Sequence, residues 1–199
     1  MAFSRQTMSP KMALQQRYAS SRASLLIVVV FTLINCILAA TGSDTYFLFS
    51  ASIPYYLAFY GSLFCGLMPE VYYTPESGFD PSFEFFDISA LYIMLSIAVI
   101  ITLVYGVFWF MSRKEKYEWL IAALIFFGVD TIGMIALSGF SVDMLLDVLM
   151  HAYVIISLIS GITAIPKLKA VRAEEEAILQ AEVAEEKADS NINNSDYGE

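Results

Sequence analysis

Basic residues are missing from a long part of this sequence. No lysine or arginine occurs between Arg22 and Arg113. Cysteine and histidine are also scarce, with Cys36, Cys65 and the single His151. Two cysteines expected at different depths do not make a disulfide framework, and one histidine gives a thin set of metal ligands. The sequence therefore disfavours a disulfide-stabilised domain and leaves any metal site weakly supported.

Several motifs of enzymes are absent as well. The chain contains no Gly-x-Ser-x-Gly, no glycine-rich phosphate loop and no His-Glu-x-x-His. Its basic residues lie in short clusters beside apolar runs, where membrane topology explains them without nucleic-acid binding. We therefore expect no cofactor, no nucleic-acid partner and, on balance, no enzymatic activity.

Apolar residues dominate what is present. Hydrophobic residues make up 58% of the 199 residues, and the mean hydropathy is +0.64. Four apolar runs reach the ~20 residues that a bilayer core requires. The sequence therefore predicts an all-α integral membrane protein with four transmembrane helices. The expected spans are residues 23–42, 88–111, 117–137 and about 142–165, with Pro166 ending the last.

A fifth apolar run, Tyr46–Leu67, admits two interpretations. If it does not span, all basic clusters fall on the cytoplasmic side and the acidic segment Glu70–Asp87 falls outside, as the positive-inside rule requires. We therefore expect a re-entrant or interfacial element broken at Pro54. An ordinary fifth span remains the alternative, because local hydropathy alone favours it.

This topology divides the chain into three parts in the plasma membrane, with both termini cytoplasmic. Residues 1–22 form a basic segment, in which Ser9 and Pro10 predict the start of a helix along the inner surface. Residues 23–165 form the membrane domain, including the outer segment 43–87. Residues 166–199 form an acidic helix and, from Ser190, a disordered tail.

The outer segment is rich in aromatic residues. Such residues concentrate at membrane interfaces and in binding hot spots, so both an interfacial belt and a docking surface are open interpretations. Capture of a cationic ligand by aromatic faces and carboxylates is a third. The candidate docking residues are Tyr55, Tyr56, Tyr60, Tyr72 and Tyr73.

Ionisable residues interrupt the last two apolar runs. If these runs form an antiparallel hairpin that turns at residues 138–141, Asp130 and His151 share a depth of roughly 15 Å below the outer surface. Asp143, Asp147 and His151 are spaced by four residues and lie on one helix face. An ionisable group at mid-bilayer costs ~2.5–3.5 kcal/mol unless it is paired or hydrated, which makes this cluster a candidate site. The candidate residues are Asp130, Asp147, His151, Tyr153 and Asn35.

The cluster has two open interpretations. As a structural clamp it would stabilise helix packing by ~0.6–2 kcal/mol. As a working site it would carry protons, cations or a metal ion. Three functions follow: an accessory membrane subunit that binds a protein partner, which we favour; a proton- or cation-coupled transport component, possible as an oligomer; and, last, a metal-dependent membrane enzyme.

The segregation of basic residues predicts the topology. A membrane-impermeant thiol reagent added outside should modify Ser77→Cys and should leave Ser112→Cys unmodified, because the two positions are expected on opposite faces of the membrane. Modification of Ser112→Cys from outside would mean that Tyr46–Leu67 spans the bilayer.

Overall fold

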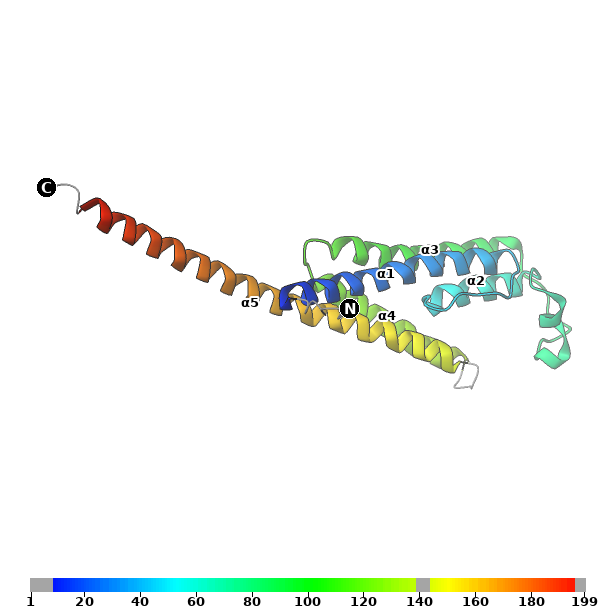
Figure 1. Ribbon diagram of the computed structural model, residues 1–199. Coiled ribbons are helices and arrows are strands. Elements are labelled where there is room, and N and C mark those ends of the chain that lie inside the picture. The colour runs from blue at the N-terminus through cyan, green and yellow to red at the C-terminus, as the bar shows by residue number, and fades with distance from the viewer. Residues whose placement is uncertain (1–8, 139–143, 196–199) are drawn as a thin grey trace, which may run out of the picture.

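The computed structural model describes residues 9–138 and 144–195 (Figure 1). These residues form helices, and no strand occurs among them. The elements are α1 (Pro10–Ala40), α2 (Ser52–Phe64), the 3-10 helices η1 (Glu70–Tyr73) and η2 (Pro75–Ser77), α3 (Ile88–Met111), α4 (Glu118–Ser138) and α5 (Leu145–Ser195). Four of them, α1, α3, α4 and α5, are long and apolar enough to cross a membrane. The predicted all-helical architecture with four candidate spans is confirmed.

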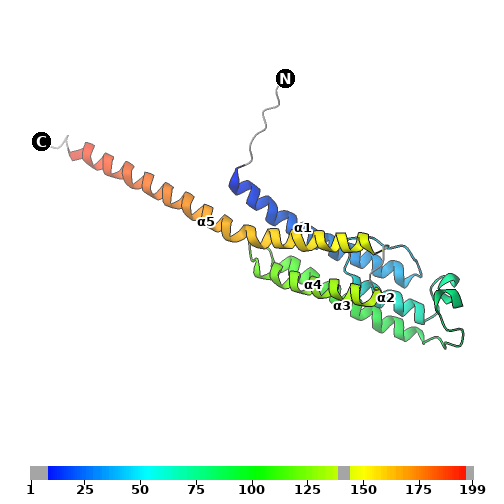
Figure 2. The same cartoon turned by 90° about the horizontal axis from the view of Figure 1, so that it is seen from below.

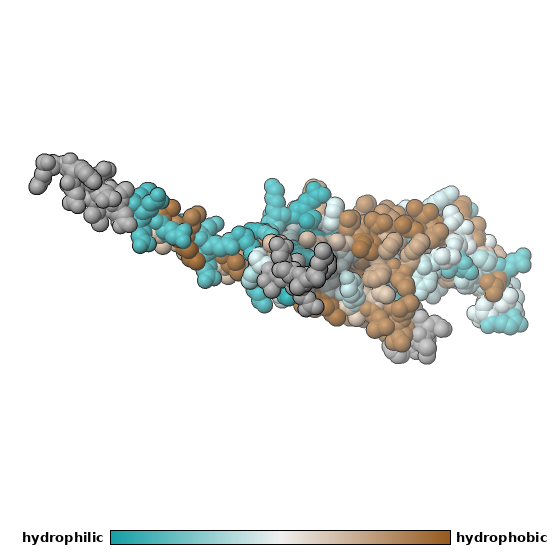
Figure 3. All heavy atoms as spheres, viewed as in Figure 1, coloured by the Kyte–Doolittle hydropathy of each residue, from teal (hydrophilic) through white to brown (hydrophobic). Residues whose placement is uncertain are grey.

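The four long helices pack lengthwise into a bundle, with α2 beside α1 and α3 (Figures 1 and 2). Leu25, Tyr105, Phe127 and Leu158 are among the fully buried residues of its core. Large apolar side chains also cover the outside of the bundle, and Figure 3 shows this hydrophobic surface over its middle. A bundle that is apolar inside and outside suits a lipid environment, because lipid tails are as apolar as the core.

The run Tyr46–Leu67 does not form a fifth helix of spanning length. Its helix, α2, has 13 residues, or about 20 Å, which is shorter than the ~30 Å hydrocarbon core. Pro54 does not break this helix, because it lies in the first turn, where a missing N–H removes no helical hydrogen bond. The chain leaves α1, runs back along it without regular structure, and turns into α2 at Ser52.

Basic residues gather at one end of the bundle, which we call the basic end. There Lys11 pairs with Glu175, and both terminal nitrogens of Arg172 lie 2.7 Å from the Glu115 carboxylate oxygens. The opposite end, which we call the aromatic end, carries residues 65–87. Both α1 and the long extension of α5 therefore start from the same end, as expected for an even number of spans (Figure 1).

The loop at the basic end affects the choice of a labelling position. Ser112 is fully buried, and its hydroxyl accepts a hydrogen bond from Arg22 Nε at 3.1 Å. The exposed Lys116 lies on the same loop. Lys116→Cys is therefore the better probe of this face.

Three expectations for the helices differ from the structure. Pro166 does not end the fourth span, because α5 continues through it to Ser195. The buried Ile165 and Leu168 pack into the core that includes Tyr18 of α1, so tertiary packing outweighs the cost of the proline. The sequence predicts that the helix of the basic segment runs along the inner surface of the membrane. The same packing instead keeps residues 10–22 in line with the rest of α1. The helix also includes residues 190–195, for which composition predicts disorder.

Candidate functional site

The site is built around the amino-terminal end of α2. The first four N–H groups of a helix have no partner within the helix, and the N-cap residue here, Ala51, offers no side chain to accept from them. Asp130 of α4 supplies the missing acceptor: Oδ2 accepts from the Ser52 N–H and Oδ1 from the Ile53 N–H, both at 2.8 Å. Asp130 is 2% exposed. Its carboxylate therefore caps a helix from another part of the chain.

The magnitudes explain why an apolar helix tolerates Asp130. Placing a carboxylate at mid-bilayer costs ~2.5–3.5 kcal/mol on insertion scales. Each hydrogen bond to a charged group contributes ~1.5–3 kcal/mol, and the helix dipole favours an anion at this end by up to ~2 kcal/mol. Two such bonds at a helix amino terminus are sufficient to offset the insertion cost.

Polar residues of α1 hold the segment that leads into α2. The Asn35 side chain accepts from the Phe47 N–H and donates to the Phe47 carbonyl, each at 2.7 Å, and donates to Ser50 Oγ at 2.8 Å. The Thr32 hydroxyl accepts from the Ala51 N–H at 2.8 Å. Together with Asp130, these side chains bond to backbone groups of Phe47, Ala51, Ser52 and Ile53.

His151 of α5 lies beside this cap. Its ring stacks on Phe127, with centroids 4.9 Å apart. Nδ1 lies 2.9 Å from the Asp147 carbonyl, which can only accept, so Nδ1 carries a proton. Nε2 lies 3.3 Å from Ser52 Oγ and 3.5 Å from Asp130 Oδ2. In the neutral imidazole, Nε2 therefore accepts from the Ser52 hydroxyl, and in the imidazolium it can donate to Asp130.

The predicted meeting of Asp130 and His151 is confirmed. The other candidates lie elsewhere. Asn35 contacts the segment before α2 rather than the pair, and Tyr153 is 54% exposed and packs edge-on against Phe49, outside the cluster. Asp143 and residues 139–141 of the expected turn lie outside the described residues.

A cavity of about 230 Å³ lies between α2, α5 and the segment before α2. Asp147 and Tyr46 line it, and the Tyr46 hydroxyl donates to Asp147 Oδ2 at 2.8 Å. Burial, followed by this hydrogen bond, raises the pKa of the Tyr46 hydroxyl, so it remains a donor. Ser52 and His151 also line the cavity. The cavity thus connects an exposed tyrosine to the buried cluster.

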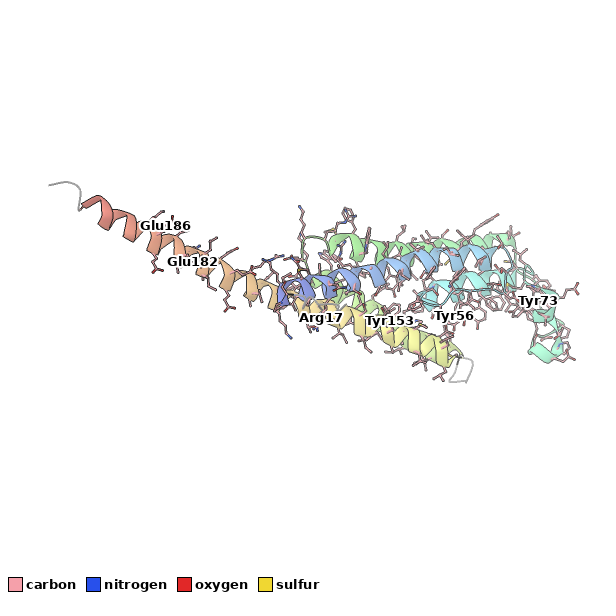
Figure 4. The ribbon with its side chains drawn as sticks, viewed as in Figure 1. Arg17, Tyr56, Tyr73, Tyr153, Glu182 and Glu186 are labelled. Carbon is pink, nitrogen blue, oxygen red and sulfur yellow. The ribbon has the colours of Figure 1, made fainter. Side chains whose placement is uncertain are left out.

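The candidate docking tyrosines serve two different structural roles. Tyr55 and Tyr56 line the cavity. Tyr72 packs edge-on against Phe59, and the Tyr73 hydroxyl accepts from the Met68 N–H at 2.8 Å and donates to the Leu63 carbonyl at 3.1 Å. The Tyr73 ring also packs edge-on against Phe79 and Phe85. Figure 4 labels Tyr73 at the aromatic end. Tyr60, 37% exposed, remains the most accessible of the five.

Ser52 and His151 resemble a nucleophile and its general base in spacing alone. Acyl transfer also needs backbone N–H donors for the developing oxyanion. The N–H groups of Ser52 and Ile53 that would serve already donate to Asp130. Within the described residues, no group of three or more His, Cys, Asp and Glu side chains could hold a metal ion. The geometry favours a structural cap over a catalytic centre.

Sequence reasoning missed Ser52, Thr32 and the backbone N–H groups that donate hydrogen bonds to Asp130. One signal was present: Pro54 inside an apolar run marks the first turn of a helix. A helix that starts inside such a run leaves N–H groups away from water, and these require an acceptor from another segment. Asp130 is the acid nearest the middle of a predicted span, so this requirement points to it.

The cap predicts a specific pattern of stability. Asp130→Asn should lower the free energy of unfolding by ~2 kcal/mol, because the amide replaces one of the two acceptor oxygens with an NH₂ group and removes the negative charge. His151→Gln should cost ~1 kcal/mol, and the double variant should lose less than the sum, because the two side chains are neighbours. Thermal unfolding in detergent, followed by circular dichroism, measures these differences.

Thr131→Val is the matched control. The Thr131 hydroxyl bonds only to the Phe127 carbonyl of its own helix, so its loss should change stability by less than ~0.5 kcal/mol. Strictly additive effects of the Asp130 and His151 substitutions would contradict a coupled cluster.

No protein-family model matches this chain, and the comparisons with curated proteins and with solved structures gave no match either. A role for the site therefore has to follow from its own contacts. Those contacts describe a buried carboxylate that caps a short helix, a histidine beside it, and a tyrosine-lined cavity that leads to both.

Proposed function

We propose that this chain is a multi-pass membrane protein that acts by binding, as an accessory subunit of a protein partner. Its four long apolar helices support insertion into a bilayer, and the positive-inside rule assigns the basic end to the cytoplasmic side of the plasma membrane. Both termini are then cytoplasmic. The cap on α2 supports a binding role, because the Asp130 carboxylate and the first N–H groups of α2 already bond to each other within the chain.

The observation that carries this proposal is the extension of α5. Beyond Glu175, the last residue to pair with α1, the helix leaves the bundle and projects away from it (Figures 1 and 2). Ile178, Leu179 and Val183 are between 41% and 60% exposed there. Most helical stability in proteins comes from packing of an apolar face against another surface, which the extension lacks within the part of the chain that the structure describes. Apolar side chains on a projecting helix are typical of helix-in-groove recognition.

The charge of the extension indicates what kind of surface it binds. Residues 173–187 contain six glutamates and one lysine. Figure 4 shows Glu182 and Glu186 along this helix, away from the bundle. Two such helices side by side would bring like charges together, which is unfavourable. A basic groove on a different protein is the better complement.

Removal of the apolar side chains should release the partner. Ile178→Ser with Leu179→Ser should abolish co-purification of a protein that the wild-type chain captures from native membranes, because such anchors supply most of the binding energy. Glu182→Gln with Glu186→Gln is the matched control and should only weaken capture.

Truncation after Ala173 should also lose the partner. It should leave thermal stability of the bundle nearly unchanged, since the Lys11–Glu175 pair that it removes is exposed.

An identical set of captured proteins with wild type, with the double serine variant and with the truncated chain would contradict this proposal. A large loss of bundle stability on truncation would instead mean that the extension packs on the core.

A second candidate function is proton- or cation-coupled transport. The cavity favours it, since Asp147 and His151 both line that space and His151 reaches Asp130. The hydrogen bonds of Asp130 argue against transport. Because both of its carboxylate oxygens already accept from backbone N–H groups, no continuous path for a proton or cation runs through Asp130. This candidate therefore depends on Asp147 and His151.

Substitution of the cavity acid separates the two functions. In proteoliposomes with an internal pH dye, a transporter should lose cation-driven proton movement on Asp147→Asn and keep it on Asp44→Asn. Asp44 is an acid of the expected outer segment, residues 43–87, and does not line the cavity. For an accessory subunit, we expect neither variant to change proton movement from that of protein-free liposomes.

A further inference from the structure

A second and larger cavity lies on the other side of α5, near the basic end. It measures about 420 Å³ and is an open groove between α1 and α5. Its polar lining includes Gln16, Arg17 and Ser20 from α1 and Ser157 and Ser160 from α5. These side chains can all donate hydrogen bonds, and one of them carries a positive charge. No acidic residue lines the groove.

Next to the groove lies an apolar trough of about 200 Å³. Ile27, Phe31 and Phe49 line the trough, and Tyr153 lines both cavities. Ser24 lines the trough and Ser157 lines the groove, and their hydroxyls, 2.9 Å apart, join α1 and α5. The two cavities are thus neighbours that meet at Tyr153, with polar side chains toward the basic end and apolar side chains toward the middle of the bundle.

The depth of this feature follows from the packing of α1 against α5. A Cβ added at Gly161 would overlap the Ser21 side chain, so these two residues lie opposite each other in antiparallel helices. Tyr153 is eight residues before Gly161 and lies about 12 Å further from the basic end. Figure 4 labels Arg17 and Tyr153, and both lie beside the contact between α1 and α5. The first predicted span begins at residue 23, which places Arg17 at the membrane–water boundary.

Arg17 has no protein partner among the described residues, unlike four other basic residues at this end of the bundle. Lys11 and Arg172 form ion pairs, Arg22 hydrogen-bonds to Ser112, and Lys169 lies over the Tyr117 ring. Within residues 9–138 and 144–195, Arg17 makes no hydrogen bond or ion pair, and its side chain is exposed at the groove. A guanidinium among hydroxyl and amide donors is suited to a phosphate group.

We propose that the groove between α1 and α5 binds an anionic phospholipid, with the headgroup phosphate at Arg17 and an acyl chain in the trough beside Tyr153. Charge, donor groups, depth and the apolar continuation all match this ligand. Anionic lipids are abundant in the cytoplasmic leaflet, where basic pockets between helices recognise their headgroups. The proposal rests on the proposed insertion of the bundle with its basic end cytoplasmic, and is independent of the protein partner.

Lipid selectivity tests this site. The full chain in detergent is exposed to phosphatidylglycerol and phosphatidylcholine with identical acyl chains, and bound lipid is counted by native mass spectrometry. Wild type should retain phosphatidylglycerol preferentially. Arg17→Gln should lower its affinity about five-fold, the effect of ~1 kcal/mol per basic residue. Ser160→Phe fills the groove without changing charge, and it should reduce binding of this lipid as well.

Lys116→Gln is the matched control, because it removes one exposed positive charge at the same end without touching the groove. Equal losses for Arg17→Gln and Lys116→Gln would overturn the site in favour of general attraction. Unchanged binding in Arg17→Gln or Ser160→Phe would also overturn it. Soluble glycerophosphate should not displace the lipid, and displacement would overturn the role of the trough. A separate experiment tests membrane insertion itself: native membranes are washed with alkaline carbonate without detergent. Release of the chain by this wash would mean that it is not inserted.

Discussion

The two hydrogen bonds from Ser52 and Ile53 to the Asp130 carboxylate decide how the half of this molecule toward the aromatic end is built. They allow a helix to begin inside the bundle, where a side chain accepts from its first N–H groups. Because α2 begins there, the chain between α1 and α2 must run back along α1, and this return forms one wall of the cavity at Asp147. The position of His151, beside the cap and stacked on Phe127, is a consequence of the same arrangement.

Three polar residues of the apolar helices share one task. Asn35, Thr32 and Asp130 come from two different helices, yet each provides hydrogen bonds to the backbone between Phe47 and Ile53. Unpaired backbone groups in an apolar surrounding cost several kcal/mol each, so irregular chain is tolerated at this depth only where side chains replace water. These polar residues look isolated in the sequence. In the structure they are hydrogen-bond acceptors and donors for one segment of the chain.

The sequence was most informative where physical rules act locally. Hydropathy and charge located α3 and α4 to within one or two residues, and hairpin symmetry brought Asp130 to His151. It failed where distant packing decides. Pro166 continues a helix because Ile165 and Leu168 are buried against α1, and Tyr153 faces away from the cluster because residues two apart on a helix point to different sides. The cap itself was missed, because its donors are backbone groups and the one signal of them in the sequence, Pro54 in a first helical turn, is indirect.

The unbroken course of α5 gives the molecule a mechanical property. One helix joins His151, deep in the bundle, to Ser195 at its far end, a separation of roughly 66 Å at the rise of an α-helix. Such a helix is a lever arm: a tilt of about 5° at the level of His151 displaces Ser195 by roughly 6 Å. Pro166 lies about a third of the way along, where a missing hydrogen bond makes bending easiest. A change of tilt in the packed part of α5 would therefore move the distal end of the extension further than any residue inside the bundle.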